Sequence, residues 1–250
     1  MAKTKSLSLE KKSPRIDFFI IICFFIFFNS FDYSLLNKNT IVSGWLNVIF
    51  LIIFTIILII YISKTKLFKF KTTDNTAISL FAPLFFICFI NIFYLNIFQI
   101  SWHFENLESY NLVIIFVKVL IEEIIFRKIF WDNFDFKNKI IKLLVGSSLF
   151  SVIHLLNLIN GNYIGVFVQV GYTFLIGFLM LIMYNFSNSL SLVVSFHLLY
   201  NLFNNELVKI PSEYYFSGNY FVYIFIICML TVLYMLFVFI FSENKINCKK

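Results

Sequence analysis

Apolar segments of about 20 residues recur along this 250-residue chain from one end to the other. A helix of about 20 apolar residues crosses the roughly 30 Å hydrocarbon core of a bilayer. Inside a bilayer no water can satisfy the backbone polar groups, so a helix, which satisfies them internally, is the expected form of each segment. With 60% hydrophobic and only 13% charged residues, the chain is predicted to fold as an all-α, polytopic membrane helix bundle.

We expect about eight transmembrane helices in a single integral-membrane domain, residues 1–250, without a soluble module. The expected spans are approximately 16–36, 41–62, 77–100, 112–130, 140–160, 163–185, 188–205 and 219–241. The first span is interrupted by polar residues, among them Asp17 and Asp32, and no small-residue cleavage site follows it. We therefore expect this segment to be retained as a signal-like anchor.

The net charge of +7 follows the expected topology. Seventeen of the 20 lysines and arginines lie before the first span, after the second, around the connection between the fourth and fifth, or after the last. The alternate connections hold only Lys38 and Lys209, and Lys118 lies inside a helix. The positive-inside rule then predicts a multi-pass protein of the cell membrane with both termini cytoplasmic. The basic charge is thus explained by the lipid bilayer as partner, and no nucleic-acid partner is expected.

Five charged residues lie inside the fourth expected span: Lys118, Glu122, Glu123, Arg127 and, near its end, Lys128. A charge near the bilayer centre costs roughly 2.5–3.5 kcal/mol on insertion scales, so such residues mark a functional site by default. Residues four apart share a helix face, which stacks Glu123 over Arg127 and Lys118 over Glu122. One interpretation is a set of ion pairs that serves packing alone. Adjacent glutamates point about 100° apart, however, so one can pair with Arg127 while the other faces a cavity.

Two further expected spans carry pairs at the same four-residue spacing. Phe150 and His154 lie in the fifth span, and His197 and Asn201 lie in the seventh. Each polar residue alone is most simply explained as an interhelical hydrogen-bonding group. Together with the glutamates, these residues provide a carboxylate base, imidazoles and an amide donor. That set is sufficient for hydrolysis by an activated water with stabilisation of an oxyanion.

The ordered motifs resemble those of a known family. EEIIFR at 122–127 resembles EExxxR, FSVIH at 150–154 resembles FxxxH, and HLLYN at 197–201 resembles HxxxN. In this order, each in a separate expected helix, they look like the CPBP intramembrane proteases, the CaaX-protease and bacteriocin-processing (Abi) family. The matching catalytic core is about 112–205. One departure is visible, because Lys128 stands where a glycine commonly follows the motif arginine.

The resemblance implies an intramembrane endopeptidase that hydrolyses a peptide bond in a membrane-associated peptide or protein. Such proteins act in bacteriocin self-immunity or in peptide-pheromone processing. The implied catalytic residues are a water-activating pair, Glu122 with His154, and an oxyanion-stabilising pair, His197 with Asn201. The implied site-ordering residues are Glu123, Arg127 and Phe150.

The resemblance leaves the cofactor open between zinc and none. The family is often named metalloprotease, and Glu122, His154 and His197 could provide a ligand set with one open position for water. The chain has no H-E-x-x-H helix, so the zincin geometry is not available. An amide beside His197 fits oxyanion donation better than zinc ligation.

Two other functions fit parts of the pattern. A catalytically silent bacteriocin-immunity or membrane scaffold protein would keep the fold and use a surface, although a degenerate member of the family should lose catalytic positions and none is lost here. A secondary transporter could use the charges as a proton relay. Transporters tend to show inverted repeats and broken helices, whereas this chain shows no repeat and places only Pro83 of its three prolines within an expected span.

Overall fold

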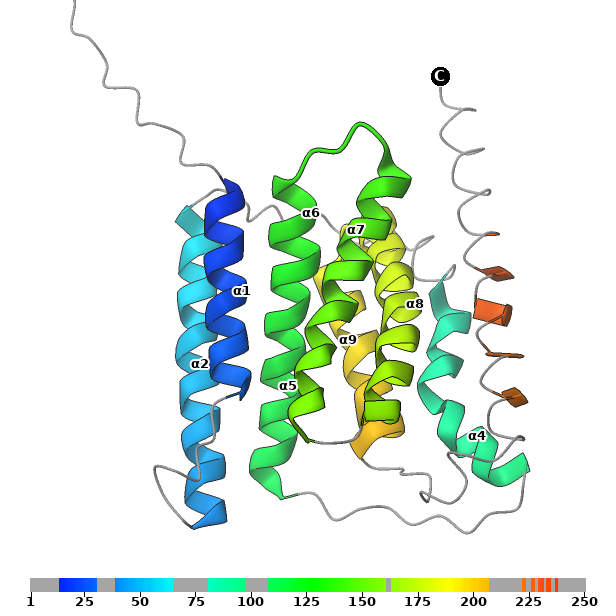
Figure 1. Ribbon diagram of the computed structural model, residues 1–250, viewed down its shortest axis with the longest axis horizontal. Coiled ribbons are helices and arrows are strands. Elements are labelled where there is room, and N and C mark those ends of the chain that lie inside the picture. The colour runs from blue at the N-terminus through cyan, green and yellow to red at the C-terminus, as the bar shows by residue number, and fades with distance from the viewer. Residues whose placement is uncertain are drawn as a thin grey trace, which may run out of the picture.

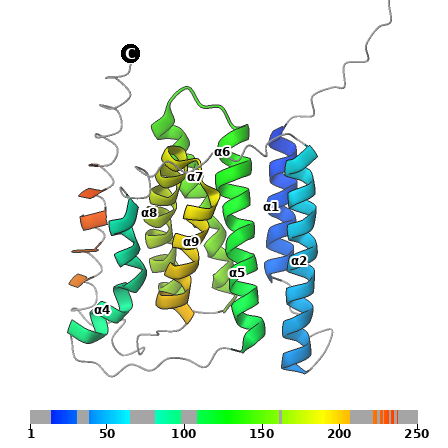
Figure 2. The same ribbon diagram turned by 180° about the vertical axis from the view of Figure 1, so that it is seen from behind.

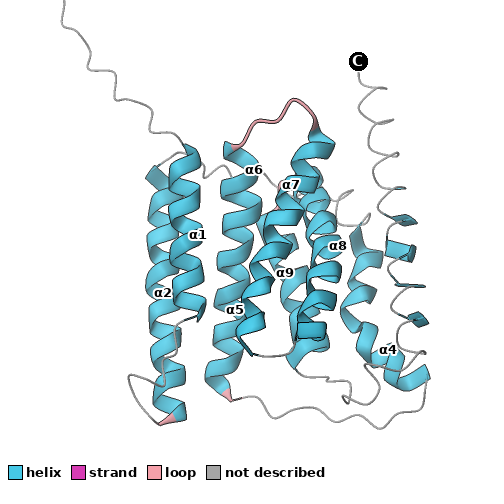
Figure 3. Ribbon diagram, in the orientation of Figure 1, coloured by secondary structure: helices cyan, strands magenta, loops and turns pink. Residues whose placement is uncertain are grey.

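The computed structural model describes residues 14–30, 39–64, 81–97, 108–160 and 163–206, with a few further residues between 222 and 237. Every regular element in these ranges is helical, which confirms the predicted all-α class (Figure 3). In chain order the elements are α1 (Pro14–Ser30), α2 (Thr40–Lys64), η2 (Ala82–Phe89), α4 (Ile90–Ile97), α5 (Ser109–Glu123), η3 (Ile124–Ile129), α6 (Phe130–Asn133), α7 (Lys139–Val152), η4 (Ile153–Asn160), α8 (Tyr163–Ser187), α9 (Leu190–Asn201) and η5 (Leu202–Glu206).

Three helices among the described residues are long and apolar enough to cross a membrane: Thr40–Ser63, Lys139–Leu158 and Gln169–Ser187. Shorter apolar helices cover Asp17–Phe27 and Leu190–Asn204. The chain is therefore a multi-pass membrane protein, whereas the count of eight spans and the cytoplasmic termini stay predictions. Most of the eighth expected span, 219–241, lies outside the described residues.

The expected fourth span is one unbroken helical stretch formed by α5, η3 and α6. Figures 1 and 2 show this stretch in the middle of the bundle, with α1 and α2 on one side and α7, α8 and α9 on the other. The same views place the start of α1, the end of α2 and the connection from α6 to α7 at one edge of the bundle. These are the ends around which the sequence concentrates its basic residues, so the arrangement agrees with the predicted orientation.

Two capped turns set the order of the helices around α5. The side chain of Asn138 accepts a hydrogen bond of 2.8 Å from the backbone N–H of Ile140 at the start of α7. The side chain of Ser189 accepts one of 3.2 Å from Leu192 at the start of α9. Asn188, with φ of 49°, ends α8 in the left-handed region that asparagine tolerates. Because these connections are short, α7 lies antiparallel to α6, and α9 lies antiparallel to α8.

Two glycines allow α7 and α8 to pack closely. A Cβ on Gly177 would lie 2.8 Å from Cδ1 of Phe150, and one on Gly146 would lie 2.7 Å from Cε1 of Phe130. The ring of Phe150, 1% exposed, therefore occupies the space that a side chain at 177 would fill. This packing matters for function because Phe150 belongs to the second sequence motif.

Candidate active site

The three motif-bearing helices each change their winding at the motif. Glu123 is the last residue of α5 before the π-helical η3, in which the backbone N–H of Phe130 bonds to the carbonyl of Ile125. His154 lies in the 3₁₀-helical η4, and Asn201 is the last residue of α9 before the π-helical η5. π-Helical turns are rare and often occur at functional sites. The irregular winding thus marks the same positions as the sequence motifs.

Glu123 and Arg127 form the ion pair expected from their spacing. Arg127 Nε lies 3.0 Å from Glu123 Oε2, and both side chains are completely buried. The two atoms are close without being aligned for a hydrogen bond, and none of the described residues offers a hydrogen-bond partner to Nη1 or Nη2. Cζ of Arg127 lies 4.6 Å from the ring centroid of Phe150. A carboxylate and an aromatic face therefore compensate the buried guanidinium charge.

Glu123 also holds His197, which sequence reasoning did not anticipate. His197 Nδ1 lies 2.8 Å from Glu123 Oε1, and the histidine is 5% exposed. One carboxylate thus bridges Arg127 on its own helix and an imidazole on α9. No signal in the sequence identifies the glutamate that faces His197, because spacing along one helix does not fix its rotation toward another.

The neighbours of His197 define which of its ring nitrogens carries a proton. Nδ1 donates to the Glu123 carboxylate, and Nε2 lies 3.1 Å from Nδ2 of Asn201. An amide N–H can only donate, so Nε2 of the neutral ring acts as the acceptor. Glu122 Oε2 lies 3.7 Å from the same Nε2, and its side chain is 12% exposed, compared with 0% for Glu123. The adjacent glutamates therefore occupy different environments, and Glu122 is the more accessible of the two.

Phe150 packs between the two membrane histidines. Its ring centroid lies 5.2 Å from that of His154 and 5.7 Å from that of His197, both in edge-on contacts. Nδ1 of His154 lies 3.0 Å from the carbonyl oxygen of Phe150, so it donates to the backbone and leaves Nε2 as the acceptor. Glu122 and His197 are both close enough to act electrostatically on His154. The helical stretch that carries the second motif, α7 with η4, thus belongs to the same cluster.

All seven site residues expected from the motifs lie in one cluster formed by α5 with η3, α7 with η4, and α9. Two other charged residues of the same helical stretch match no family motif position. Lys128 pairs with Asp132 at 2.7 Å between Nζ and Oδ2, one turn further along the same helical stretch. Lys118 is partly buried on α5, before the glutamates.

Zinc is one of the two alternatives that the resemblance left open, with Glu122, His154 and His197 as its possible ligands. No three histidine, cysteine, aspartate or glutamate side chains in the described part of the chain are placed to hold a metal ion. Both nitrogens of His197 already lie within hydrogen-bond distance of Glu123 and Asn201. Because a histidine ligand must offer a free lone pair, Glu122, His154 and His197 do not fit a zinc site as they lie here.

The fold and the site define a class of protein: a helical, multi-pass membrane protein with a buried cluster of carboxylate, imidazole and amide groups. Residues 104–203 match the family model of the Rce1-like proteins, described as Type II CAAX prenyl endopeptidase Rce1-like. This segment of the chain is therefore similar to the Rce1-like proteins, the kind of family that the three motifs resemble. Comparisons with curated proteins and with solved structures gave no match.

The matched segment includes every residue of the cluster, from Glu122 to Asn201. Helices α1, α2 and α4 lie outside this segment. The similarity to the family therefore concerns the part of the bundle that contains the site, and not the whole bundle.

Proposed function

We propose that the protein is an intramembrane endopeptidase that hydrolyses a peptide bond in a membrane-associated peptide or protein. The observation that carries this proposal is the position of Glu122, 3.7 Å from His197 and beside a fixed chain of contacts from Arg127 through Glu123 and His197 to Asn201. One carboxylate is fully engaged by structural partners, and the other remains accessible for chemistry.

Glu122 is the general base in this mechanism. It accepts a proton from a water molecule whose oxygen bonds to the carbonyl carbon of the substrate. His154 positions the same water through Nε2, because its Nδ1 is occupied by the Phe150 carbonyl. The proton held by Glu122 then passes to the nitrogen of the leaving group as the C–N bond breaks. Each step therefore uses a group that the described contacts leave free.

His197 and Asn201 stabilise the oxyanion that forms when water adds to the carbonyl. The amide of Asn201 has two N–H bonds, of which one donates to Nε2 of His197 and the other to the oxyanion. His197, held at Nδ1 by the Glu123 carboxylate, thereby orients this donor. Burial strengthens these interactions because the effective dielectric constant is lower than in water. Glu123 and Arg127 order the site without touching the substrate.

The test is the Glu122→Gln substitution, which keeps the size of the side chain and removes the base. Cells that produce either form are compared by mass spectrometry of the peptide termini in their membrane fractions. Termini that depend on the protein should be present with the wild type and at least about 100-fold reduced with the variant, the usual contribution of a general base. The matched control is Glu108→Gln, an exposed glutamate just before α5 that should preserve them.

Undiminished cleavage by the folded Glu122→Gln protein would rule out this function. A role in bacteriocin self-immunity or in pheromone processing is separated from catalysis by a second assay. If cells stay protected from a bacteriocin when Glu122 and His154 are both replaced, the protein is a catalytically silent immunity or scaffold protein. If protection is lost with the substitutions while the protein is still made, immunity depends on proteolysis.

A further inference from the structure

A pocket lies beside the face of the central helical stretch that is opposite Glu122. It has a volume of about 310 Å³, and its walls come from α2, α5, η3, α8 and α9. Leu120, Ile124 and Lys128 lie four residues apart and line it from one face of the central helical stretch. Glu122 is two residues from Leu120 and from Ile124, so it projects from the opposite face, about 200° away. None of the seven residues of the catalytic cluster lines this pocket.

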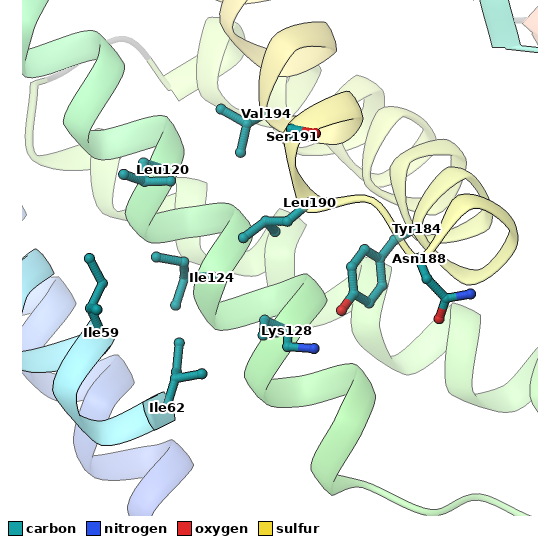
Figure 4. A pocket seen from close by; sticks show the side chains of 10 residues that line it. All are labelled: Ile59, Ile62, Leu120, Ile124, Lys128, Tyr184, Asn188, Leu190, Ser191 and Val194. Atoms are coloured by element: carbon teal, nitrogen blue, oxygen red, sulfur yellow. The ribbon is translucent and has the colours of Figure 1, made fainter. Parts of the chain in front are cut away.

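The pocket is divided into an aliphatic side and a polar side. In Figure 4 four aliphatic side chains, Ile59, Ile62, Leu120 and Ile124, lie on the left, and Tyr184 and Asn188 lie on the right, with the other residues between them. The aliphatic residues are Ile59, Ile62, Leu120, Ile124, Leu190 and Val194, and the polar residues are Lys128, Tyr184, Asn188 and Ser191. Such a division fits an amphiphile, with an apolar chain on one side and a polar group on the other.

The polar side is rich in hydrogen-bond donors. Lys128 supplies an ammonium group, and Ser191 lies in the first turn of α9, where the helix dipole favours an anion. Tyr184 is only 3% exposed, and its hydroxyl forms no hydrogen bond with a described residue. In Figure 4 this hydroxyl points toward the part of the pocket where Lys128 lies. The Tyr184 hydroxyl is therefore a second donor, beside the Lys128 ammonium group, that can bind an acceptor on a ligand.

The position of the pocket relative to the expected membrane surface indicates which kind of amphiphile it fits. Helix α2, which contributes Ile59 and Ile62, is one of the helices long and apolar enough to cross a membrane. Lys128 is two residues before α6, whose connection to α7 lies at the edge of the bundle with the basic ends (Figure 1). The polar side is thus directed toward the expected level of the lipid headgroups, and the aliphatic side lies among the acyl chains.

We propose that this pocket is a binding site for an anionic phospholipid. One acyl chain lies against the isoleucines of α2 and the facing residues of α5 and α9, and the phosphate accepts hydrogen bonds from Lys128 and Tyr184. Lys128 is also the residue that replaces the usual glycine after the motif arginine. This departure therefore places a cation in the pocket and leaves the catalytic cluster unchanged.

Asp132 is the acidic residue in contact with this site, since its Oδ2 lies 2.7 Å from Lys128 Nζ. A phosphate must share the ammonium group with this carboxylate. The two residues therefore make opposite contributions, because Lys128 attracts the lipid and Asp132 competes with it. Substitutions of Lys128 and Asp132 should therefore change the affinity for the lipid in opposite directions.

The test is native mass spectrometry of the full chain in detergent, with added phosphatidylglycerol or phosphatidylcholine of the same acyl chains. Wild-type protein should retain phosphatidylglycerol preferentially. Lys128→Gln should weaken its binding about fivefold, the effect of roughly 1 kcal/mol per basic residue near anionic lipid. Tyr184→Phe should weaken it by a similar factor, and Asp132→Asn should strengthen it. Lys139→Gln, at an exposed lysine on the same edge, is the matched control and should have no effect.

The aliphatic side is tested with a pair of neighbouring residues on α2. Ile59→Trp should fill the pocket and reduce retention of the lipid, whereas Ile60→Trp changes a residue that is 48% exposed outside the pocket and should not. Equal retention of the two lipids by the wild type would overturn the proposal. So would a Lys128→Gln protein that is folded and binds phosphatidylglycerol as tightly as the Lys139→Gln protein. Recovery of a peptide or an isoprenoid in place of phospholipid would overturn it as well.

Discussion

His197 Nδ1 lies 2.8 Å from Glu123 Oε1, and this contact joins the first and third sequence motifs in space. The second oxygen of the same carboxylate lies 3.0 Å from Arg127 Nε. Glu123 thus bonds to a cation on its own helical stretch and to an imidazole on α9, and it has no exposed surface. The position of His197, and through it that of Asn201, depends on this one side chain.

We expect Glu123→Gln to destabilise the protein far more than Glu122→Gln. Removing the Glu123 charge leaves Arg127 buried without its counter-ion, which typically costs about 3–5 kcal/mol. Glu122 is partly exposed, and its nearest partner, His197, is 3.7 Å away, so its loss should cost less than about 1 kcal/mol. The measurement is the free energy of unfolding in mixed micelles. Equal losses for the two variants would contradict the assigned difference between the glutamates.

A second substitution, at Arg127, should restore part of the stability that Glu123→Gln removes. Arg127→Met alone leaves the Glu123 carboxylate buried with only His197 beside it, whereas Glu123→Gln combined with Arg127→Met removes both charges together. Replacing a whole buried pair is usually far less costly than breaking it. The cycle should therefore give a coupling energy of about 1–3 kcal/mol, measured by the same unfolding experiment. Additive effects would show that the ion pair contributes nothing to stability.

Gly177→Ala should displace the Phe150 ring and thereby disturb the site, although residue 177 belongs to no motif. The new Cβ would lie 2.8 Å from Phe150 Cδ1, and the Phe150 ring contacts His154, His197 and Arg127. Overpacking of this kind costs about 1–3 kcal/mol and should also lower the yield of protein-dependent peptide termini.

The matched control is Gly171→Ala in the same helix, α8, because a Cβ at 171 meets nothing within 4 Å. That substitution should be neutral, or should stabilise the helix by about 0.5–1 kcal/mol. A Gly177→Ala protein that matches the Gly171→Ala protein in unfolding and in peptide termini would contradict the role given to Phe150.

Removal of divalent metals should leave proteolysis intact, since the described residues offer no metal ligand set and both His197 nitrogens are engaged. The experiment measures cleavage by purified protein in vesicles before and after treatment with a chelator, with the metal content determined by elemental analysis. Loss of activity that stoichiometric zinc restores would show that the cluster rearranges around a metal.

The helical class, the multi-pass character of the chain and the contacts between residues four apart could be predicted from the sequence. This was possible because hydropathy and the four-residue spacing are local properties of the chain. The pairing of Glu123 with Arg127 is an example, since both residues lie on one helical stretch and the expected contact is present. The same reasoning placed His197 and Asn201 on one face of α9, and their side chains are 3.1 Å apart.

Contacts between helices could not be predicted in this way. Each residue turns a helix by about 100°, so the glutamate that meets His197 depends on how α5 is rotated against α9. Packing fixes that rotation through the close approach at Gly177 and the Phe150 ring between the two histidines. The π-helical turn that follows Glu123 further changes the direction in which the next side chains point, and no residue pattern in the sequence predicts this turn.

The sequence by itself therefore determined that the chain is a helical membrane protein and which of its residues are candidates for chemistry. The reason is that a charged residue inside an apolar span is costly and therefore rare. Only the tertiary structure decided which of these candidates meet: Glu123 bridges Arg127 and His197, and Glu122 remains accessible. It also decided that Lys128 lines a separate pocket. The physical reason is that a helix specifies its own faces, whereas the partner of each face is chosen by the packing of the whole bundle.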